Sequence, residues 1–146
     1  MGLKVTGGST VIRGLAIRNF GSLAAGPDIP AEGAIVLEGY GGNRVQGNFI
    51  GTGLVGGGSD LTQNGVIVRN SPDNTIGGDT PSAPNVISGN SHSGVLITGS
   101  AATGNRIRGN LIGTGRRGRS ARPNADGITV RNAPDNAIGG AAPSAR

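Results

Sequence analysis

The chain has no cysteine and no tryptophan, and its 146 residues include one histidine, one tyrosine and two phenylalanines. The absence of cysteine excludes a disulfide scaffold, a thiolate metal site and a cysteine nucleophile. A single histidine without cysteine argues against a zinc site. No apolar run approaches the length of a membrane-spanning helix, and the first residues show no signal peptide. We therefore expect no metal centre, no bound cofactor and no insertion into a membrane.

Glycine and proline, in contrast, are abundant. They account for 38 of 146 residues, or 26%, a share that also occurs in disordered chains. Leucine, isoleucine, valine and phenylalanine nevertheless number 33, of which 23 are isoleucine or valine, and the net charge is only +5. This β-branched supply favours a folded chain built from strands.

A repeat of 62 residues organises the sequence into the blocks 43–104 and 105–146. Residues 43–84 and 105–146 are identical at 22 of 42 aligned positions. The motif Asn-x-[Ile/Val]-x-Gly begins at Asn43, Asn74, Asn105 and Asn136, with a variant at Thr10, so the structural unit is about 31 residues long. A second Asn-x-Ile motif and a segment of alternating apolar residues complete each unit. Each unit is therefore predicted to hold three short strands between glycine and asparagine turns.

Strands this short cannot bury themselves and must stack on the equivalent strand of the next unit. The spacing predicts two interior columns, which are Ile12, Val45, Ile76, Ile107 and Ile138, and Ile17, Ile50, Ile87 and Ile112. The four motif asparagines are expected to form a column at a strand entrance. Asparagine tolerates the left-handed conformation that such corners need, and stacked amides can bond to one another. Residues 1–146 are thus predicted to form one all-β domain, a parallel β-helix of about four and a half coils.

Three phrases carry a resemblance: NVISGN at 85–90, GNLIGTG at 109–115 and NTIGG at 74–78. With them the chain resembles the right-handed parallel β-helix repeat proteins of bacteria, in the pectate-lyase-like superfamily. The resemblance implies a right-handed coil and a location outside the cell or at its surface. That fold hosts lyases, hydrolases, epimerases, adhesins and inert stalks, so it selects no single activity.

In the resembled family, loops at one corner of the coil wall a polysaccharide groove along the sheet formed by the alternating apolar segments. Here that face would include the strand residues Glu38, Ile67, Arg69, Leu96, Thr98, Thr129 and Arg131. The connections at this corner would add Asp28, Glu32, Asp60 and His92 as contacts. The alternative is that these are ordinary solvent-facing residues.

The connection at 116–122 has the sequence RRGRSAR and contains Arg116, Arg117, Arg119 and Arg122. Without these four residues the net charge falls from +5 to +1. The loop is therefore either an anion site or a solvated basic loop. Only three aromatic residues exist and none lies near it, which disfavours nucleic acid as the partner.

A second set of basic residues follows the Asn-x-[Ile/Val] strands. Arg44, Arg106 and Arg108 fall on outward positions, together with Arg13 and Gln46. Arg44 and Arg106 are two coils apart, roughly 10 Å. Such a column suits a polyanion, and it would equally keep an exposed sheet soluble and prevent lateral association.

The residues that catalysis would need are scarce. The eight acidic residues form no Asp-Asp pair, and His92 lacks a neighbouring hydrolase signature. Residues 56–60 (GGGSD) are similar to calcium-binding repeats but lack their full period, so calcium is left without support.

We therefore expect a non-enzymatic structural or surface-displayed scaffold that contacts glycans or other polyanions. The alternative is a polysaccharide lyase or hydrolase whose site is truncated or unrecognised. Neither end carries a recognisable cap, so the chain is expected to be a fragment of a longer array or to associate end to end.

Overall fold

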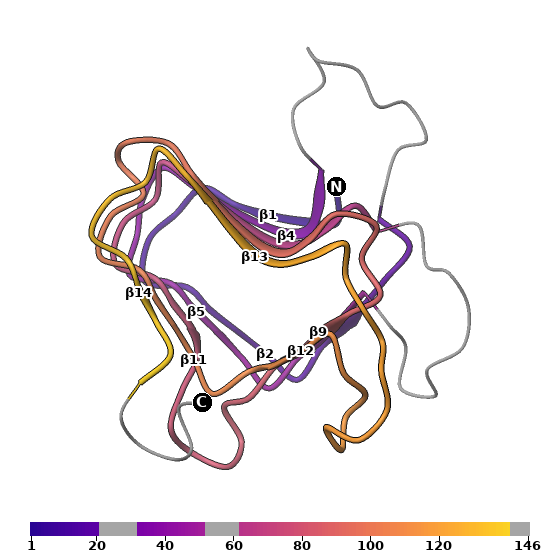
Figure 1. Ribbon diagram of the computed structural model, residues 1–146. Helices are drawn as coiled ribbons and strands as arrows, with labels where there is room; N and C mark the ends of the chain where they lie inside the picture. The colour runs from indigo at the N-terminus through magenta and orange to yellow at the C-terminus, as the bar shows by residue number, and fades with distance from the viewer. Residues whose placement is uncertain (21–31, 52–61, 141–146) are drawn as a thin grey trace.

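The computed structural model describes residues 1–20, 32–51 and 62–140. The named strands in these residues pair in parallel and build three sheets, which the chain visits in the same order in each coil (Figure 1). Later residues lie nearer the viewer in Figure 1 while the chain runs counter-clockwise, so the coil is right-handed. The predicted β-helix is confirmed as a solenoid of about 4 turns with roughly 31 residues per turn.

The strands of the three sheets differ in length. The first sheet consists of β1 (Leu3–Val5), β4 (Gly33–Glu38), β7 (Asn64–Arg69), β10 (Ser93–Thr98) and β13 (Asp126–Arg131). The second consists of β2 (Val11–Arg13), β5 (Arg44–Gln46), β8 (Thr75–Gly77), β11 (Arg106–Arg108) and β14 (Ala137–Ile138). The third consists of β3 (Ala16–Ile17), β6 (Phe49–Gly51), β9 (Val86–Ser88) and β12 (Leu111–Ile112).

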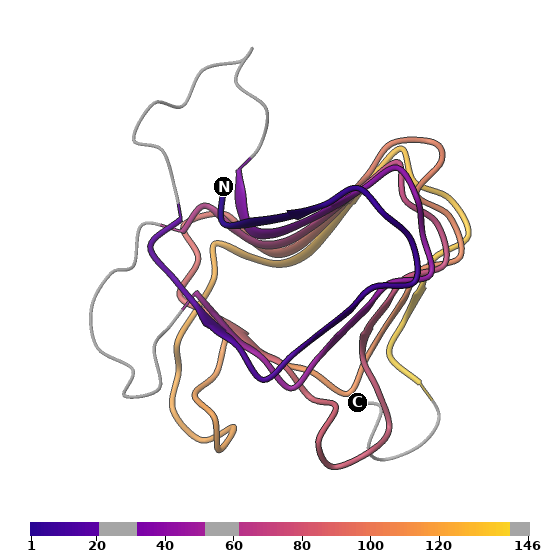
Figure 2. The ribbon, with the colours of Figure 1, turned by 180° about the vertical axis from the view of Figure 1, so that it is seen from behind.

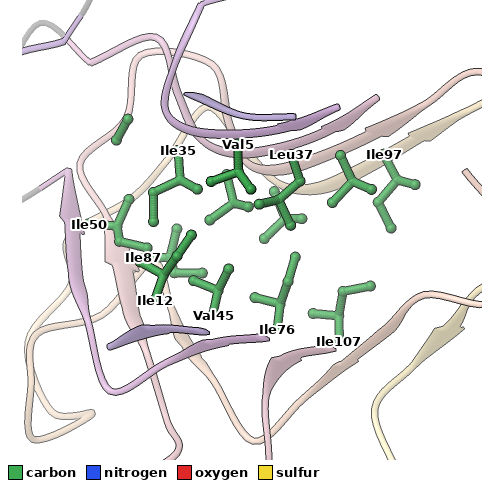
Figure 3. Packing of buried hydrophobic residues seen from close by; sticks show 14 of the residues in the cluster. Val5, Ile12, Ile35, Leu37, Val45, Ile50, Ile76, Ile87, Ile97 and Ile107 are labelled. Carbon is green, nitrogen blue, oxygen red and sulfur yellow. The ribbon is translucent and has the colours of Figure 1, made fainter. Parts of the chain in front are cut away.

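The interior consists of aliphatic side chains stacked in register. In the second sheet Ile12 pairs with Val45, Val45 with Ile76, Ile76 with Ile107 and Ile107 with Ile138. The third sheet stacks Ile17, Ile50, Ile87 and Ile112 in the same way. Both predicted columns are confirmed in register, and they face the inner residues of the first sheet across one core (Figure 3). The exception is Ile138 in the last coil, which was predicted to be interior and is 54% exposed. Each fully buried isoleucine contributes about 2 kcal/mol of hydrophobic stabilisation.

An asparagine ladder leads into the second sheet. The Nδ2 of Asn43 donates to Oδ1 of Asn74 at 2.8 Å, Asn74 donates to Asn105 at 2.8 Å, and Asn105 donates to Asn136 at 2.9 Å. Each acceptor oxygen also receives the backbone N–H of the preceding ladder asparagine. The predicted amide-to-amide bonding is thus confirmed, and the buried amides are satisfied.

A second ladder leads into the third sheet. Asn48 donates to Asn85 at 3.0 Å, and Asn85 donates to Asn110 at 2.8 Å. The second and third sheets therefore both begin at stacked asparagines, which fixes the corners between strands that have only two or three residues.

The left-handed backbone lies elsewhere than expected. None of the four asparagines of the first ladder has a positive φ, so the expectation that they adopt the left-handed conformation was wrong. The left-handed residues lie in the turn just before them: Asn70 and Asn132 with φ 46 and 49, and Asp73 and Asp135 with φ 54 and 58. The ladder asparagines use their side chains to bridge coils instead.

These left-handed positions explain why the repeat is 62 residues long rather than 31. Glycine occupies the equivalent sites in alternate coils, with φ +93 at Gly99 and φ +66 at Gly104. A Cβ on Gly99 would clash with the amide of Asn70, and one on Gly104 would clash with the carboxylate of Asp73. A side chain in one coil therefore requires a glycine in the next coil.

Candidate functional site

The basic segment forms a hairpin of residues 113–122. Arg122 donates its N–H to the carbonyl of Gly113 at 2.9 Å, Gly115 donates to Ser120 at 2.8 Å, and Thr114 and Ala121 form an antiparallel bridge. The carbonyl of Arg122 accepts the N–H of Gly89, which ties the hairpin to the coil below. The backbone that carries the arginines is therefore held by hydrogen bonds at its base and along its length.

The four arginines of this hairpin are Arg116, Arg117, Arg119 and Arg122, and all are exposed. In the part of the chain that the structure describes, none of them forms an ion pair. Their mutual repulsion is therefore not offset by a neighbouring carboxylate. An anionic partner would supply that compensation.

The hairpin lies beside the third sheet. Gly118 at its tip approaches Leu111, whose Cδ2 would lie 3.7 Å from a Cβ at position 118. Figures 1 and 2 both show residues 113–122 projecting from the end of the third sheet, away from the first sheet. This basic loop thus does not wall a groove over the first sheet, the place that the resemblance implied for loops of this corner.

The middle of the first sheet's outer face is apolar and buried. Val36, Ile67 and Leu96 pair in register and form a cluster separate from the interior, with exposures of 0%, 0% and 6%. The alternative that the strand residues of this face are ordinary solvent-facing residues is therefore wrong for Ile67 and Leu96. Accessible side chains on this face lie towards the ends of the strands and on the two edge strands, where Lys4 and Thr129 continue the same row.

A charge pair occupies one end of that face. Glu38 Oε2 lies 2.7 Å from Lys4 Nζ and 3.8 Å from Arg69 Nη1. The hydrogen bond from Lys4 lowers the pKa of Glu38 from its ordinary value, opposed by desolvation and helped by the charges of Lys4 and Arg69. Glu38 is therefore held ionised and is a poor proton donor at neutral pH. Arg131, two coils beyond Arg69, is exposed.

The other groove candidates make simple contacts. The exposed His92 has its Nδ1 3.2 Å from Oγ of its chain neighbour Ser91. Glu32 accepts from the amino group of Met1 at 3.0 Å. Asp28 and Asp60 lie outside the described residues. Among the described residues, Glu32 and His92 thus have different partners, and no contact brings the two side chains together.

The basic residues of the second sheet occupy two outward rows. Arg44 and Arg106 flank Thr75, and both arginines are exposed. In the second row, Arg108 Nη1 pairs with Asp79 Oδ2 at 2.9 Å. One of the predicted polyanion contacts is therefore already neutralised by a carboxylate.

Asp79 belongs to a loop whose docking the sequence did not indicate. Residues 79–84 fold back over coil two, where Gly47 donates its N–H to the carbonyl of Ala83 at 3.0 Å. Beside the loop lies a hollow of about 220 Å³, lined by Arg13, Gly14, Gln46, Gly47 and Ser82. In the sequence, the only sign of this loop was that the connection at 79–84 is longer than the equivalent connection in the other coils.

The third sheet has an apolar outer row that sequence reasoning also missed. Register places Ala16 beside Phe49, Phe49 beside Val86 and Val86 beside Leu111. The signal was the residue between asparagine and isoleucine in each Asn-x-Ile motif, which is Phe49, Val86 and Leu111 in three coils.

No family model, curated protein or solved structure matches the chain. Within residues 1–20, 32–51 and 62–140, no helix is long and apolar enough to cross a membrane. The same residues contain no group of three or more His, Cys, Asp or Glu side chains that could hold a metal ion.

Proposed function

We propose that the chain is a non-enzymatic β-helix scaffold that presents a cationic hairpin to polyanions. The observation that carries this proposal is the hairpin of residues 113–122, closed by backbone hydrogen bonds and bearing four exposed arginines that form no ion pair with any described residue. A backbone fixed before binding lowers the conformational entropy lost when the arginines meet a partner. The rest of the chain is nearly neutral, because removing these arginines lowers the net charge from +5 to +1.

We propose further that this scaffold belongs to the pectate-lyase-like superfamily of bacterial β-helices and acts outside the cell or at its surface. The parallel coil, its repeat of about 31 residues and its asparagine ladders support the affiliation. The location follows from the affiliation alone.

The alternative, a polysaccharide lyase or hydrolase, is not favoured by any contact described above. Enzymes that cleave glycosides with acid catalysis use two carboxyl groups on either side of the scissile bond. Glu32, Glu38 and Asp79 each pair with a cation instead.

Salt-dependent retention on a heparin column tests the proposal. If each arginine contact contributes about 0.5 kcal/mol, replacing all four hairpin arginines by serine should weaken affinity about thirtyfold. The elution salt concentration should fall accordingly, because these contacts are electrostatic and screened.

A matched variant removes the same charge from other surfaces, at Arg18, Arg44, Arg106 and Arg131. It should retain most of the affinity. If the hairpin variant elutes with the unmodified chain, or if the matched variant loses as much, the hairpin is not the polyanion site.

A further inference from the structure

The tip of the basic hairpin, residues 116–119, is only lightly held. Figures 1 and 2 show the hairpin projecting from the solenoid, and residues 116–122 are all exposed. Among the N–H groups of the tip, only that of Gly118 donates to a described backbone carbonyl, at Gly115, over 2.8 Å. The other hairpin bonds lie nearer the base. The tip can therefore open locally while the sheets stay paired.

Elsewhere in the described residues, the backbone around lysine and arginine does not suit a peptidase. A peptidase binds the residues around the bond that it cuts as an extended strand. A segment already paired in a sheet, or turned by a positive φ just after the bond, does not offer that shape. Lys4, Arg44 and Arg106 are each followed by a buried residue of the same strand. Left-handed residues, with φ from 46 to 72, follow Arg13, Arg18, Arg69, Arg108 and Arg131.

The same criteria select two bonds within the hairpin. The bonds after Arg117 and Arg122 are excluded, because the first leads into a left-handed glycine with φ 67 and the second into a proline. The bonds that remain in the described chain are Arg116–Arg117 and Arg119–Ser120. Each becomes extended once the few hydrogen bonds of the hairpin tip open.

We propose that the hairpin is a processing site for an arginine-specific serine peptidase, which cuts at Arg116–Arg117 and Arg119–Ser120. The guanidinium before each bond fits a specificity pocket that holds a carboxylate. Each cut consumes one water: the C–N bond breaks, the carbonyl carbon takes the hydroxyl group and the nitrogen takes the proton. The two cuts together release residues 117–119.

This inference rests on the proposed function and adds a way to regulate the same site. Two of the four hairpin arginines leave with the released tripeptide. The new carboxylate of Arg116 and the new amino group of Ser120 cancel, so the formal charge of the hairpin falls from +4 to +2. Processing would thus weaken the attraction of the hairpin for polyanions.

The contacts that hold the last coil do not involve the released residues. β13 pairs with β10 over five residue pairs. Asn90 donates Nδ2 to Oδ1 of Asn124 at 2.7 Å, and Gly89 donates its N–H to the carbonyl of Arg122 at 3.2 Å. The two large fragments should therefore stay together as a nicked solenoid.

Digestion of the folded chain with trypsin, followed over time by mass spectrometry, tests the site. Fragments 1–116 and 120–146 should appear first, at least about tenfold faster than any other product, because other bonds require wider unfolding. The fragments should elute together from a sizing column and separate in urea. The nicked chain should bind heparin about fivefold more weakly than the intact chain, since two arginine contacts are lost.

The double variant Arg116→Gln/Arg119→Gln should be digested at least about tenfold more slowly than the parent, since both accessible bonds are lost. The matched variant Arg44→Gln/Arg106→Gln, changed within strands, should be digested like the parent. A first cut at Arg18, or unchanged digestion of the hairpin variant, would overturn the processing site.

Two other results separate this inference from the proposed function. Fragments that part without urea, or a nicked chain that elutes from heparin with the intact chain, would overturn the regulatory role of the cuts. An intact chain that heparin does not retain would refute the proposed function instead, while the mass spectra would still decide where the chain is cut.

Discussion

Two adjacent positions between the first and second sheets, a ladder asparagine and the turn residue before it, repeat differently from coil to coil. The ladder that contains Asn74 has asparagine in four successive coils, at intervals of 31 residues, after Thr10 in the first coil. The turn just before it alternates, with Asp73 in one coil, Gly104 in the next and Asp135 in the one after. The same stacking geometry thus selects identical residues at the ladder position and alternating residues at the turn position.

The difference follows from what each side chain offers along the stacking direction. An amide has both a donor and an acceptor, so asparagine can accept from one coil and donate to the next without limit. A carboxylate only accepts, and that of Asp73 lies where a side chain of the next coil would need space. Self-complementary groups can repeat every coil, whereas groups that are not self-complementary need a different neighbour.

Charged side chains on the first sheet also differ from one coil to the next, because like charges are not self-complementary. Glu38 pairs in register with Arg69, and Lys4 reaches Glu38 from the coil before. Like charges directly opposite on adjacent strands would be destabilising. Three substitutions test this contrast, at the ladder, at the alternating turn and at the charge pair, in order of decreasing effect.

Replacing Asn74 by alanine should have the largest effect. It removes the acceptor of the N–H and the Nδ2 of Asn43, and the donor to Asn105. The backbone N–H of Asn43 and one of the two N–H groups on its Nδ2 lose their acceptor, while the other still donates to the carbonyl of Tyr40. Two buried N–H groups left unsatisfied cost about 4 kcal/mol of the free energy of unfolding. Urea denaturation should show the loss as a lower midpoint with an unchanged slope.

The adjacent, outward-facing Thr75 provides the control. Thr75→Ala should change the free energy of unfolding by less than about 0.5 kcal/mol. A midpoint for Asn74→Ala as close to the parent as that of Thr75→Ala would show that the ladder is not a major source of stability.

Replacing Gly104 by alanine should have an intermediate effect, about 2 kcal/mol, from its left-handed φ and from the clash with Asp73. Adding Asp73→Gly should recover about half of the loss, because only the clash is relieved. Thermal unfolding of the single and double variants measures both terms.

Gly39 offers a matched site without the clash. It has φ +83, and a Cβ there would meet nothing within 4 Å. Gly39→Ala should therefore cost about 1 kcal/mol, the backbone term alone. Equal losses at Gly39 and Gly104 would contradict the packing explanation of the 62-residue repeat.

Replacing Glu38 by glutamine should have the smallest effect, less than about 1 kcal/mol, because the ion pair is partly exposed. Its pKa is lowered in the folded chain from 4.5, so its stabilisation is present above that value and is lost as the pH falls through the folded pKa. The difference in stability between parent and variant should thus be seen at pH 7 and vanish in acid. A difference that persists in acid would exclude the charge as its cause.

The features that the sequence predicted well are those that recur at a fixed interval. Ile76 and its column could be predicted because each member has the same environment as the next, and so could the bonding of the ladder amides. The left-handed conformation was predicted for the ladder asparagines but occurs one to four residues before them, because asparagine suits both a left-handed turn and a side-chain ladder. Asn70 serves the first role and Asn74 the second.

The site features could not be predicted in the same way, because they join residues that are not equivalent between coils. Arg13, Gln46 and Ser82 line one hollow only because an insertion in coil three leans back over coil two. The burial of Ile67 likewise has no local signal, since an outward strand position has the same sequence pattern whether it is covered or exposed to solvent. Such contacts depend on the lengths and directions of individual loops.

The alternation at Gly104 also sets how this molecule can change length. Duplication or loss of 62 residues would join coils so that each turn side chain still faces a glycine and each amide still faces an amide. A change of 31 residues would place the carboxylate of Asp73 against that of Asp135, where both space and charge oppose the junction. Recombination within such a gene should therefore be tolerated in steps of two coils, and the lengths of its relatives should differ by even numbers of coils.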